Sequence, residues 1–302
     1  MSVAISFVVP AFNESRFIES CLSSIVERIN KFGLDAEIIV VDNGSTDNTA
    51  ELAQRYDCDL YSISRGRIST ARNYGLAKAK NELIAFIDGD VSLTDQWFES
   101  LMSSSLFRDA PQNFLSGRQC IVPPDGTRIE RYWFANLTDK YLGGANIVTT
   151  KKAMTSLNGF NEDLETGEDY DLCLRAIEHP AVNYSPDEKL LAIHLGFPQD
   201  FRNFIRRERW HGKGDVQQFL PALRSPVVLI SILYVVALVV VLFTAVFGLY
   251  KEALMVLALF LTLNLFLTCV RFSKASFKAL LFNSLLHPFY FVARFSSFFS
   301  GR

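Results

Sequence analysis

The 302-residue sequence lacks an excess of charge of either sign. Its 30 lysine and arginine residues and 32 aspartate and glutamate residues give a formal net charge of −2. Proteins dedicated to nucleic acid carry a clear basic excess, so we expect no nucleic-acid partner. Charge is scarcest over residues 226–270, where Lys251 and Glu252 are the two charged residues. Together with a hydrophobic content of 49%, this stretch predicts a membrane component.

Cysteine is also scarce, and its pattern argues against a disulfide-linked fold. The five cysteines are an odd number, and no two of them form a Cys-x-x-Cys pair or lie near a histidine cluster. This disfavours a disulfide framework and favours reduced thiols in a reducing compartment. Residues 1–6 show no basic region and no cleavage site. We therefore expect no signal peptide and a soluble part that stays in the cytosol.

The first 90 residues alternate short β-branched apolar runs with amphipathic segments. Strands are predicted at 5–9, 36–41, 60–63 and 83–87. Helices are predicted between them at about 13–33, 48–56 and 69–80. This order predicts an α/β fold with a parallel sheet covered by helices. Ligands of such sheets bind beyond the carboxyl ends of the strands, where polar clusters occur at 10–14, 42–47 and 88–90.

The regular alternation stops after residue 91. Helices are predicted at 97–107, 151–157 and 169–178, and strands at 114–122, 147–149 and 190–194. The aromatic-rich segment 131–142 has no predicted type. The sequence shows no internal repeat.

Asp88 and Asp90 place two carboxylates at the end of an apolar run. Mg²⁺ often takes one or two carboxylates together with substrate phosphates. The pair therefore suits a metal-bound diphosphate. The alternative is that the two aspartates lie in a solvated turn. Asp42 either accepts a hydrogen bond from a nucleobase or ribose, or stabilises a turn. Arg72 and Asn73 either reach a phosphate or base, or Arg72 is a surface arginine on a helix.

Seven short motifs occur in an order and at a spacing that together make a resemblance to a known family specific. They are VVPAFNE (8–14), VVDNGSTD (40–47), ARNYG (71–75), FIDGD (86–90), GGAN (143–146), GF (159–160) and EDYDL (168–172). Over about residues 3–215 the chain resembles family 2 glycosyltransferases, of the membrane-anchored bacterial type. The resemblance implies a GT-A fold with a Rossmann-like, mostly parallel sheet. It also implies an inverting transferase that uses a nucleotide-diphosphate sugar, most often a UDP-sugar, and Mn²⁺ or Mg²⁺.

The resemblance also assigns roles to residues. The positions that match nucleotide-sugar ligands are Pro10, Ala11, Glu14, Asp42, Arg72 and Asp88. Asp90 matches the direct metal ligand, with Asp88 and His194 as further contacts, although His194 is also explained as a satisfied strand histidine. Asp169 matches the catalytic base, and Glu168 lies beside it. The positions assigned to the acceptor are Gly143, Gly144, Asn146, Arg209 and Trp210.

An inverting transfer needs one base for the acceptor hydroxyl, and the metal neutralises the leaving diphosphate. No nucleophilic serine or cysteine is therefore expected. One position departs from the pattern of processive synthases, which carry a Gln-x-x-Arg-Trp motif. Arg206 stands at the glutamine position, followed by Arg209 and Trp210. This departure favours a single transfer over processive polymerisation.

The C-terminal part contains two uncharged runs, 227–250 and 253–270. At about 1.5 Å per residue the longer run spans roughly 36 Å, enough for a bilayer core of about 30 Å. Basic residues on both outer flanks place those flanks in the cytosol. A third segment, 276–299, is either a kinked span or an interfacial helix, and we favour the interface.

The predicted domains are a GT-A domain (1–215) and a membrane domain (226–302). The first would contain a nucleotide-sugar half (1–92), an acceptor half (93–198) and a basic interfacial helix (199–212) that lies on anionic lipid. The expected protein is multi-pass in the cell inner (plasma) membrane, with its catalytic domain in the cytosol. The sequence leaves the oligomeric state undetermined.

The expected activity is transfer of a sugar to a hydroxyl of a lipid-linked or membrane-proximal glycan, as in polysaccharide biosynthesis. Alternatives are a polyprenyl-phosphate glycosyltransferase, an inactive transferase-like membrane scaffold, and a processive synthase. A phosphate acceptor needs little base catalysis, so the Glu168–Asp169 pair favours a hydroxyl acceptor.

Overall fold

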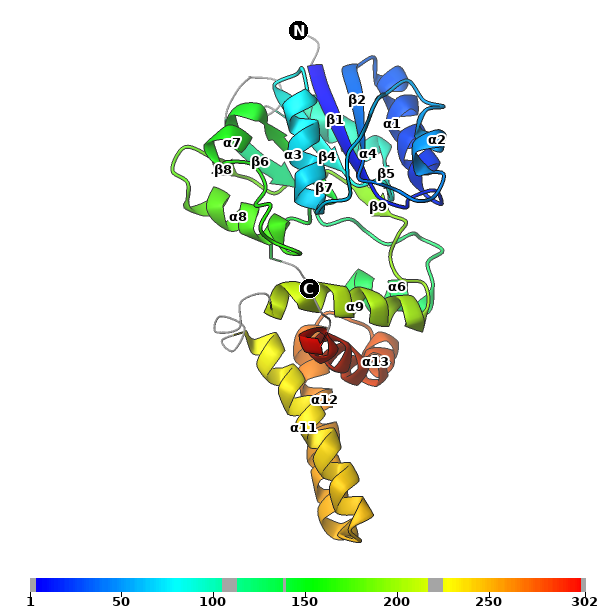
Figure 1. The fold of residues 1–302 in the computed structure, drawn as a ribbon, viewed down its shortest axis with the longest axis vertical. Helices are drawn as coiled ribbons and strands as arrows, with labels where there is room; N and C mark the ends of the chain where they lie inside the picture. Colours follow the sequence, from blue (N-terminus) through cyan, green and yellow to red (C-terminus); the bar gives the residue numbers. More distant parts are fainter. Residues whose placement is uncertain (1–3, 105–112, 138–139, 217–224, 300–302) are drawn as a thin grey trace. The chain divides into compact units, whose positions relative to one another are not determined.

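The computed structural model describes residues 4–104, 113–137, 140–216 and 225–299. The chain forms two compact units (Figure 1). The first contains residues up to 123 and residues 139–196, and the second contains 124–138 and 197–302. The predicted division into a GT-A domain and a membrane domain stays a prediction. In the structure, the segment from residue 197 onward packs within the second unit.

The first unit is built on a seven-stranded sheet of order β3-β2-β1-β4-β7-β6-β8. Its strands are β1 (Ala4–Ala11), β2 (Asp35–Asp42), β3 (Asp59–Ser62), β4 (Leu83–Ile87), β6 (Phe114–Gly117), β7 (Asn146–Thr150) and β8 (Asn183–Tyr184). Strands β3, β2, β1 and β4 are parallel, and β7 runs antiparallel to both of its neighbours. A separate antiparallel pair joins β5 (Val91–Leu93) to β9 (Ala192–His194). The expected α/β, mostly parallel fold is confirmed.

Helices cover both faces of the sheet. They are α1 (Ile18–Phe32), α2 (Thr49–Ala53), α3 (Ile68–Lys78), α4 (Asp95–Ser103), α7 (Lys151–Ser156) and α8 (Glu168–Glu178). Side chains of β1 alternate between two cores because successive strand residues point to opposite faces. Phe7 packs with α1 and α4 in one core, and Val8 packs with α3, α7 and α8 in the other. Polar side chains follow the carboxyl ends of the parallel strands β1, β2 and β4.

Several boundaries differ from the sequence-based expectations. The strand predicted over 114–122 ends at Gly117, where a φ of 148° turns the chain out of the sheet. Helix α4 begins earlier than predicted because Thr94 Oγ1 accepts a hydrogen bond from the Trp97 N–H at 3.3 Å; the predicted end at 105–107 lies outside the described residues. Strands β5 and β8 were missed, since two or three residues carry no periodic pattern.

The second unit is helical. It consists of α6 (Arg128–Tyr132), η1 (Phe134–Asn136), α9 (Phe201–Val216), α11 (Pro226–Val246), α12 (Tyr250–Arg271), α13 (Phe277–Ser296) and η2 (Ser297–Phe299). Figure 1 shows α11 and α12 as a long hairpin, with α9 and α13 lying at one end of it. The turn between α11 and α12 lies at Gly248, with a φ of 74°, so Lys251 and Glu252 lie in the first turn of α12 and not between the helices.

Within the described residues, α11 and α12 are long and apolar enough to cross a membrane, with mean hydropathies of 3.1 and 2.4. Buried polar side chains tie the three long helices together. Tyr234 Oη on α11 donates to Asn264 Oδ1 on α12 at 2.9 Å, and Asn264 Nδ2 donates to the Ser284 carbonyl of α13 at 2.8 Å. Such interhelical hydrogen bonds support packing where hydrophobicity gives little preference between protein and lipid.

Gly75 lets α3 pack closely on β1, because a Cβ there would overlap the side chain of Val8. We expect Gly75→Val to destabilise the protein by about 1–3 kcal/mol through overpacking. Ala77→Val adds similar bulk on the exposed side of the same helix and is the control. Thermal unfolding of the detergent-purified protein measures both changes. Equal unfolding midpoints for the two variants would contradict the close packing.

Candidate functional site

The polar ends of β1 and β2 are joined into one surface. The Asn43 N–H donates to the Ala11 carbonyl at 2.8 Å, which keeps the two chains together beyond the sheet. Asn13, with a φ of 55°, accepts the Thr46 N–H at 2.8 Å. The Glu14 N–H donates to Thr49 Oγ1 at 2.8 Å. The sequence clusters 10–14 and 42–47 thus lie side by side, as the sequence predicts.

Asp42 is buried at the end of β2, where its Oδ1 accepts the Ser45 N–H at 3.2 Å. The next residue, Asn43, was missed as a site residue. Its carboxamide donates to the Gly66 carbonyl at 2.9 Å and accepts the Gly66 N–H at 2.8 Å. This pair of hydrogen bonds holds the loop before α3 against β2, so that Arg65 stacks on the Phe12 ring at 3.4 Å.

Arg72 of α3 connects the two halves of the predicted active site. Its Nη2 lies 2.7 Å from Asp88 Oδ1, and its Nη1 lies 2.6 Å from Glu168 Oε1. The Arg72 side chain is 1% exposed. Burial raises the pKa of Glu168, and the charge of Arg72 opposes this rise. Arg72 was predicted to contact the nucleotide; the structure shows its guanidinium bound to two carboxylates of the protein.

Asp169 lies in the first turn of α8, next to Glu168, but it has different partners. Its Oδ2 accepts the Gly144 N–H at 2.9 Å, and its Oδ1 accepts the Tyr170 N–H at 2.8 Å. Glu168 is buried and ion-paired, whereas Asp169 is half-buried and makes no ion pair with a described residue. Of the two predicted catalytic carboxylates, Asp169 is therefore the more accessible to solvent.

Gly144 is the residue that lets these groups meet. A Cβ at this position would lie 2.7 Å from Arg72 Nη2 and 2.8 Å from Nη1. A side chain there would displace the guanidinium, so the close approach of backbone to Arg72 requires glycine. Gly144 thereby orients Asp169 through its N–H and makes room for the Arg72 ion pairs.

Asp90 lies near three other predicted ligands. Its Oδ2 is 3.7 Å from His194 Nδ1 across the β5–β9 pair, and its carbonyl accepts the Leu195 N–H at 2.8 Å. Burial, followed by the charges of Asp90 and Asp88, raises the pKa of Glu14 to about 9. Carboxylates crowded in this way suit a hard divalent cation.

The described residues contain no group of three or more His, Cys, Asp or Glu side chains close enough to hold a metal ion by themselves. This is compatible with Mg²⁺-type sites, which take one or two carboxylates and complete their coordination with water and substrate phosphates. Asp88 and Asp90 therefore fit a cation that arrives with a diphosphate.

The predicted acceptor residues are not all accessible. Asn146 is fully buried; its Oδ1 accepts from Trp97 Nε1 at 2.9 Å and its Nδ2 donates to the Leu190 carbonyl at 2.8 Å. Gly143 borders Gln119, whose carboxamide donates to the Tyr141 carbonyl at 2.8 Å. Within the first unit, Gly143 and Gly144 therefore lie near Asp169, while the Asn146 side chain is used in packing.

The remaining predicted residues are described within the unit to which each belongs. Arg209 and Trp210 are on α9 in the second unit, where the Trp210 side chain is exposed. Pro10 is the penultimate residue of β1 and is buried. Asn73 was considered with Arg72 as a contact to phosphate or base. In the structure its side chain fixes the GF motif: it accepts the Phe160 N–H and donates to the Phe160 carbonyl, both at 2.9 Å.

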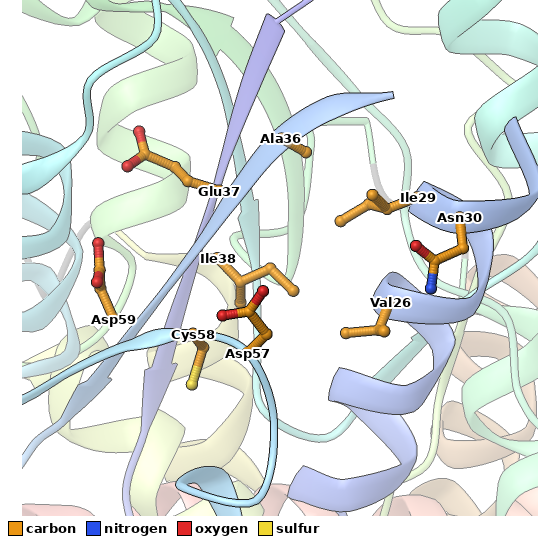
Figure 2. A pocket seen from close by; sticks show the side chains of 9 residues that line it. All are labelled: Val26, Ile29, Asn30, Ala36, Glu37, Ile38, Asp57, Cys58 and Asp59. Atoms are coloured by element: carbon orange, nitrogen blue, oxygen red, sulfur yellow. The ribbon is translucent and has the colours of Figure 1, made fainter. Parts of the chain in front are cut away.

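A cavity of about 260 Å³ lies elsewhere in the first unit (Figure 2). It is lined by the second half of α1, the start of β2 and the segment entering β3, including Ile29, Ile38 and Cys58. These are the amino ends of the strands. The cavity is therefore at the opposite end of the sheet from Asp42, Asp88 and Asp90.

Comparison with known proteins identifies the family. A family model described as glycosyl transferase family 2 matches residues 6–137, and one described as glycosyl transferase family group 2 matches residues 129–270. The chain is a family 2 glycosyltransferase. The resemblance found in the sequence motifs is thus confirmed.

Individual relatives of this glycosyltransferase are distant. Glycosyltransferase AglE of Haloferax volcanii is 25% identical over 235 residues, which are 72% of this chain and 74% of AglE. The uncharacterized glycosyltransferase EpsJ of Bacillus subtilis is 33% identical over 136 residues, which are 40% of this chain and 37% of EpsJ. The chain thus matches well under half of EpsJ.

Among solved structures, mannosyltransferase PcManGT from Pyrobaculum calidifontis, in complex with GDP-Man and Mn²⁺, aligns with 99% of this chain and 88% of its own. The TM-score is 0.56 and the sequence identity is 18%. At this identity the likeness supports the fold, and it confirms a GT-A-like domain followed by apolar helices.

Removing Arg72 would leave Asp88 and Glu168 without their counter-charge. We expect Arg72→Met to destabilise the glycosyltransferase by about 3–5 kcal/mol, as is usual when one partner of a buried ion pair is lost. Arg67→Met at the N-cap of the same helix is the control, because Arg67 pairs with Glu165 at the surface and its loss should cost at most about 1 kcal/mol. Thermal unfolding compares them; similar midpoints would argue against the buried ion pairs.

Proposed function

We propose that this protein is an inverting, metal-dependent glycosyltransferase that moves a sugar from a UDP-sugar to a hydroxyl of a lipid-linked or membrane-proximal glycan. The observation that carries the proposal is the cluster around Arg72. It joins Asp88, from the predicted donor side, to Glu168, which precedes the predicted base Asp169.

The proposed reaction is a single displacement. Asp169 accepts the proton of the acceptor hydroxyl while the hydroxyl oxygen attacks the anomeric carbon. The bond from that carbon to the diphosphate oxygen breaks, so the configuration inverts and a nucleoside diphosphate leaves. The Gly144 N–H holds the Asp169 carboxylate in place. Glu168 acts through Arg72, whose charge it balances together with Asp88, and is a positioning residue.

The donor side rests on the loops after β1 and β2. Asp42 uses Oδ1 for the Ser45 N–H, which leaves Oδ2 to accept from a nucleobase or ribose. Pro10, Ala11 and Glu14 border the same surface. UDP is proposed because it is the family's commonest nucleotide; PcManGT, in contrast, is in complex with GDP-Man.

The proposed cofactor is Mn²⁺ or Mg²⁺, held by Asp90 with Asp88 and His194. When bound, such a cation neutralises the negative charge of the leaving diphosphate. The crowding of Asp88, Asp90 and Glu14 supports it, since these carboxylates otherwise repel one another. The Mn²⁺ in PcManGT is a further supporting observation.

We place the reaction at the cytosolic face of the inner (plasma) membrane. Helices α11 and α12 support a double-spanning anchor by their length and hydropathy. Arg224 before α11 and Arg271 at the end of α12 favour a cytosolic location of both outer ends. Basic residues of α9, including Arg209, and the exposed Trp210 support contact with lipid or a membrane-bound acceptor.

We expect Asp169→Asn to lower the rate of transfer about 10²–10⁴-fold, the range that one general base contributes, while nucleotide binding stays unchanged. Asp171→Asn is the control, because Asp171 lies on the same helix and pairs with Arg175 at 2.6 Å. Transfer to a membrane-lipid extract, measured with labelled donor, distinguishes them. Only a mild loss in Asp169→Asn would favour a polyprenyl-phosphate acceptor, whose oxygen needs little base catalysis.

The donor and the metal are tested by release of nucleoside diphosphate from a panel of UDP- and GDP-sugars, with and without Mn²⁺. We expect metal-dependent release from one donor. Asp90→Asn should reduce it on the order of 10²-fold or more, since metal-ion charge stabilisation is worth several kcal/mol. Asp95→Asn, at a surface ion pair with Lys31, should keep it. Metal-dependent nucleotide binding with no release, even with membrane lipid added, would support the scaffold alternative.

A further inference from the structure

Arg271 is the last residue of the apolar helix α12. The chain beyond Glu252 contains no aspartate or glutamate, although it carries five cationic residues: Arg271, Lys274, Lys278, Arg294 and Arg302. The end of α12 and the start of α13 are therefore basic, with no acidic residue nearby in the sequence. If α12 crosses a bilayer, as proposed above, Arg271 lies at the depth of the lipid headgroups.

The guanidinium of Arg271 is held in place by aromatic rings. Its Cζ lies 4.2 Å from the ring centroid of Tyr290 and 5.2 Å from that of Trp133. A third ring, that of Phe272, is 5.7 Å away. All three rings are almost fully buried, whereas Arg271 is half-buried. The rings therefore orient the cation by cation–π contacts and leave part of it facing outward.

Arg294 offers an internal comparison, because its guanidinium also packs against Tyr290, at 5.1 Å. Arg294 is fully compensated: it pairs with Glu208 at 2.9 Å and with Asp215 at 2.6 Å. Arg271 makes no ion pair or hydrogen bond with any residue that the structure describes. Two arginines thus share one aromatic cluster, and among the residues that the structure describes only Arg294 has anionic partners.

We propose that Arg271, with Lys274 and Lys278, forms a binding site for the phosphate group of a membrane lipid. A planar guanidinium matches phosphate oxygens with paired hydrogen bonds, and the stacking rings hold it ready for them. The proposal rests on the membrane location in the proposed function. The phosphate could belong to bulk anionic phospholipid or to a lipid-linked acceptor, since both present the same group at this depth.

The test is native mass spectrometry of the full-length protein in detergent, titrated with three probes. They are dioleoylphosphatidylglycerol, a polyprenyl monophosphate, and dioleoylglycerol, which lacks phosphate. We expect both phosphate lipids to bind better than dioleoylglycerol. Arg271→Gln should weaken phosphate-lipid binding about tenfold or more, because charge-assisted hydrogen bonds are lost. The tighter of the two phosphate lipids identifies the source.

Lys251→Gln is the matched control: it removes an exposed cation at the other end of the hairpin and should leave binding unchanged. Arg271→Lys keeps the charge without the planar stack and should give an intermediate affinity, and Lys274→Gln/Lys278→Gln tests the site if Arg271→Gln does not fold. Equal binding of dioleoylglycerol, or wild-type affinity in Arg271→Gln and in the double variant, would overturn the proposal. Nucleoside diphosphate release, measured separately, reports on the transferase activity, so its absence would not be mistaken for absence of the lipid site.

Discussion

The buried ion pairs of Arg72 are the interaction on which the site depends. Two carboxylates, Asp88 and Glu168, approach one guanidinium that is almost completely removed from water. Isolated charges at this depth would be strongly unfavourable, so the three groups are stable only together. They come from α3, the end of β4 and the start of α8. This cluster therefore ties α3 and α8 to the end of β4.

The positions of Asp169 and Gly144 depend on the Arg72 ion pairs. The Gly144 backbone can lie against the Arg72 guanidinium because it has no side chain, and from there its N–H reaches Asp169. Of the two adjacent acidic residues that begin the EDYDL motif, Glu168 is buried and balances the charge of Arg72, whereas Asp169 is half-buried. Adjacent residues of the same charge acquire different chemistry because their environments differ.

The second unit also pairs its buried polar and charged side chains. Its polar contacts are buried between helices, as in the Tyr234–Asn264 pair, and its charges gather at one end. Arg294 is neutralised by Glu208 and Asp215, while Arg271 faces outward from the same aromatic cluster. In the proposed membrane location, lipid headgroups would supply the counter-charge that Arg271 lacks among the described residues.

The sequence by itself determined the α/β fold, the family, the apolar hairpin and the polar clusters after β1, β2 and β4. Periodicity and strand-end position are local properties, so they can be read from neighbouring residues. Only the tertiary structure decided the partners of Arg72, the burial of Asn146 and the contrast between Arg271 and Arg294. Each of these depends on groups far apart in the chain, such as Arg72 and Glu168. A one-dimensional pattern carries no information on which distant charge lies within 3 Å, and that distance decides whether an arginine binds a ligand or a neighbouring carboxylate.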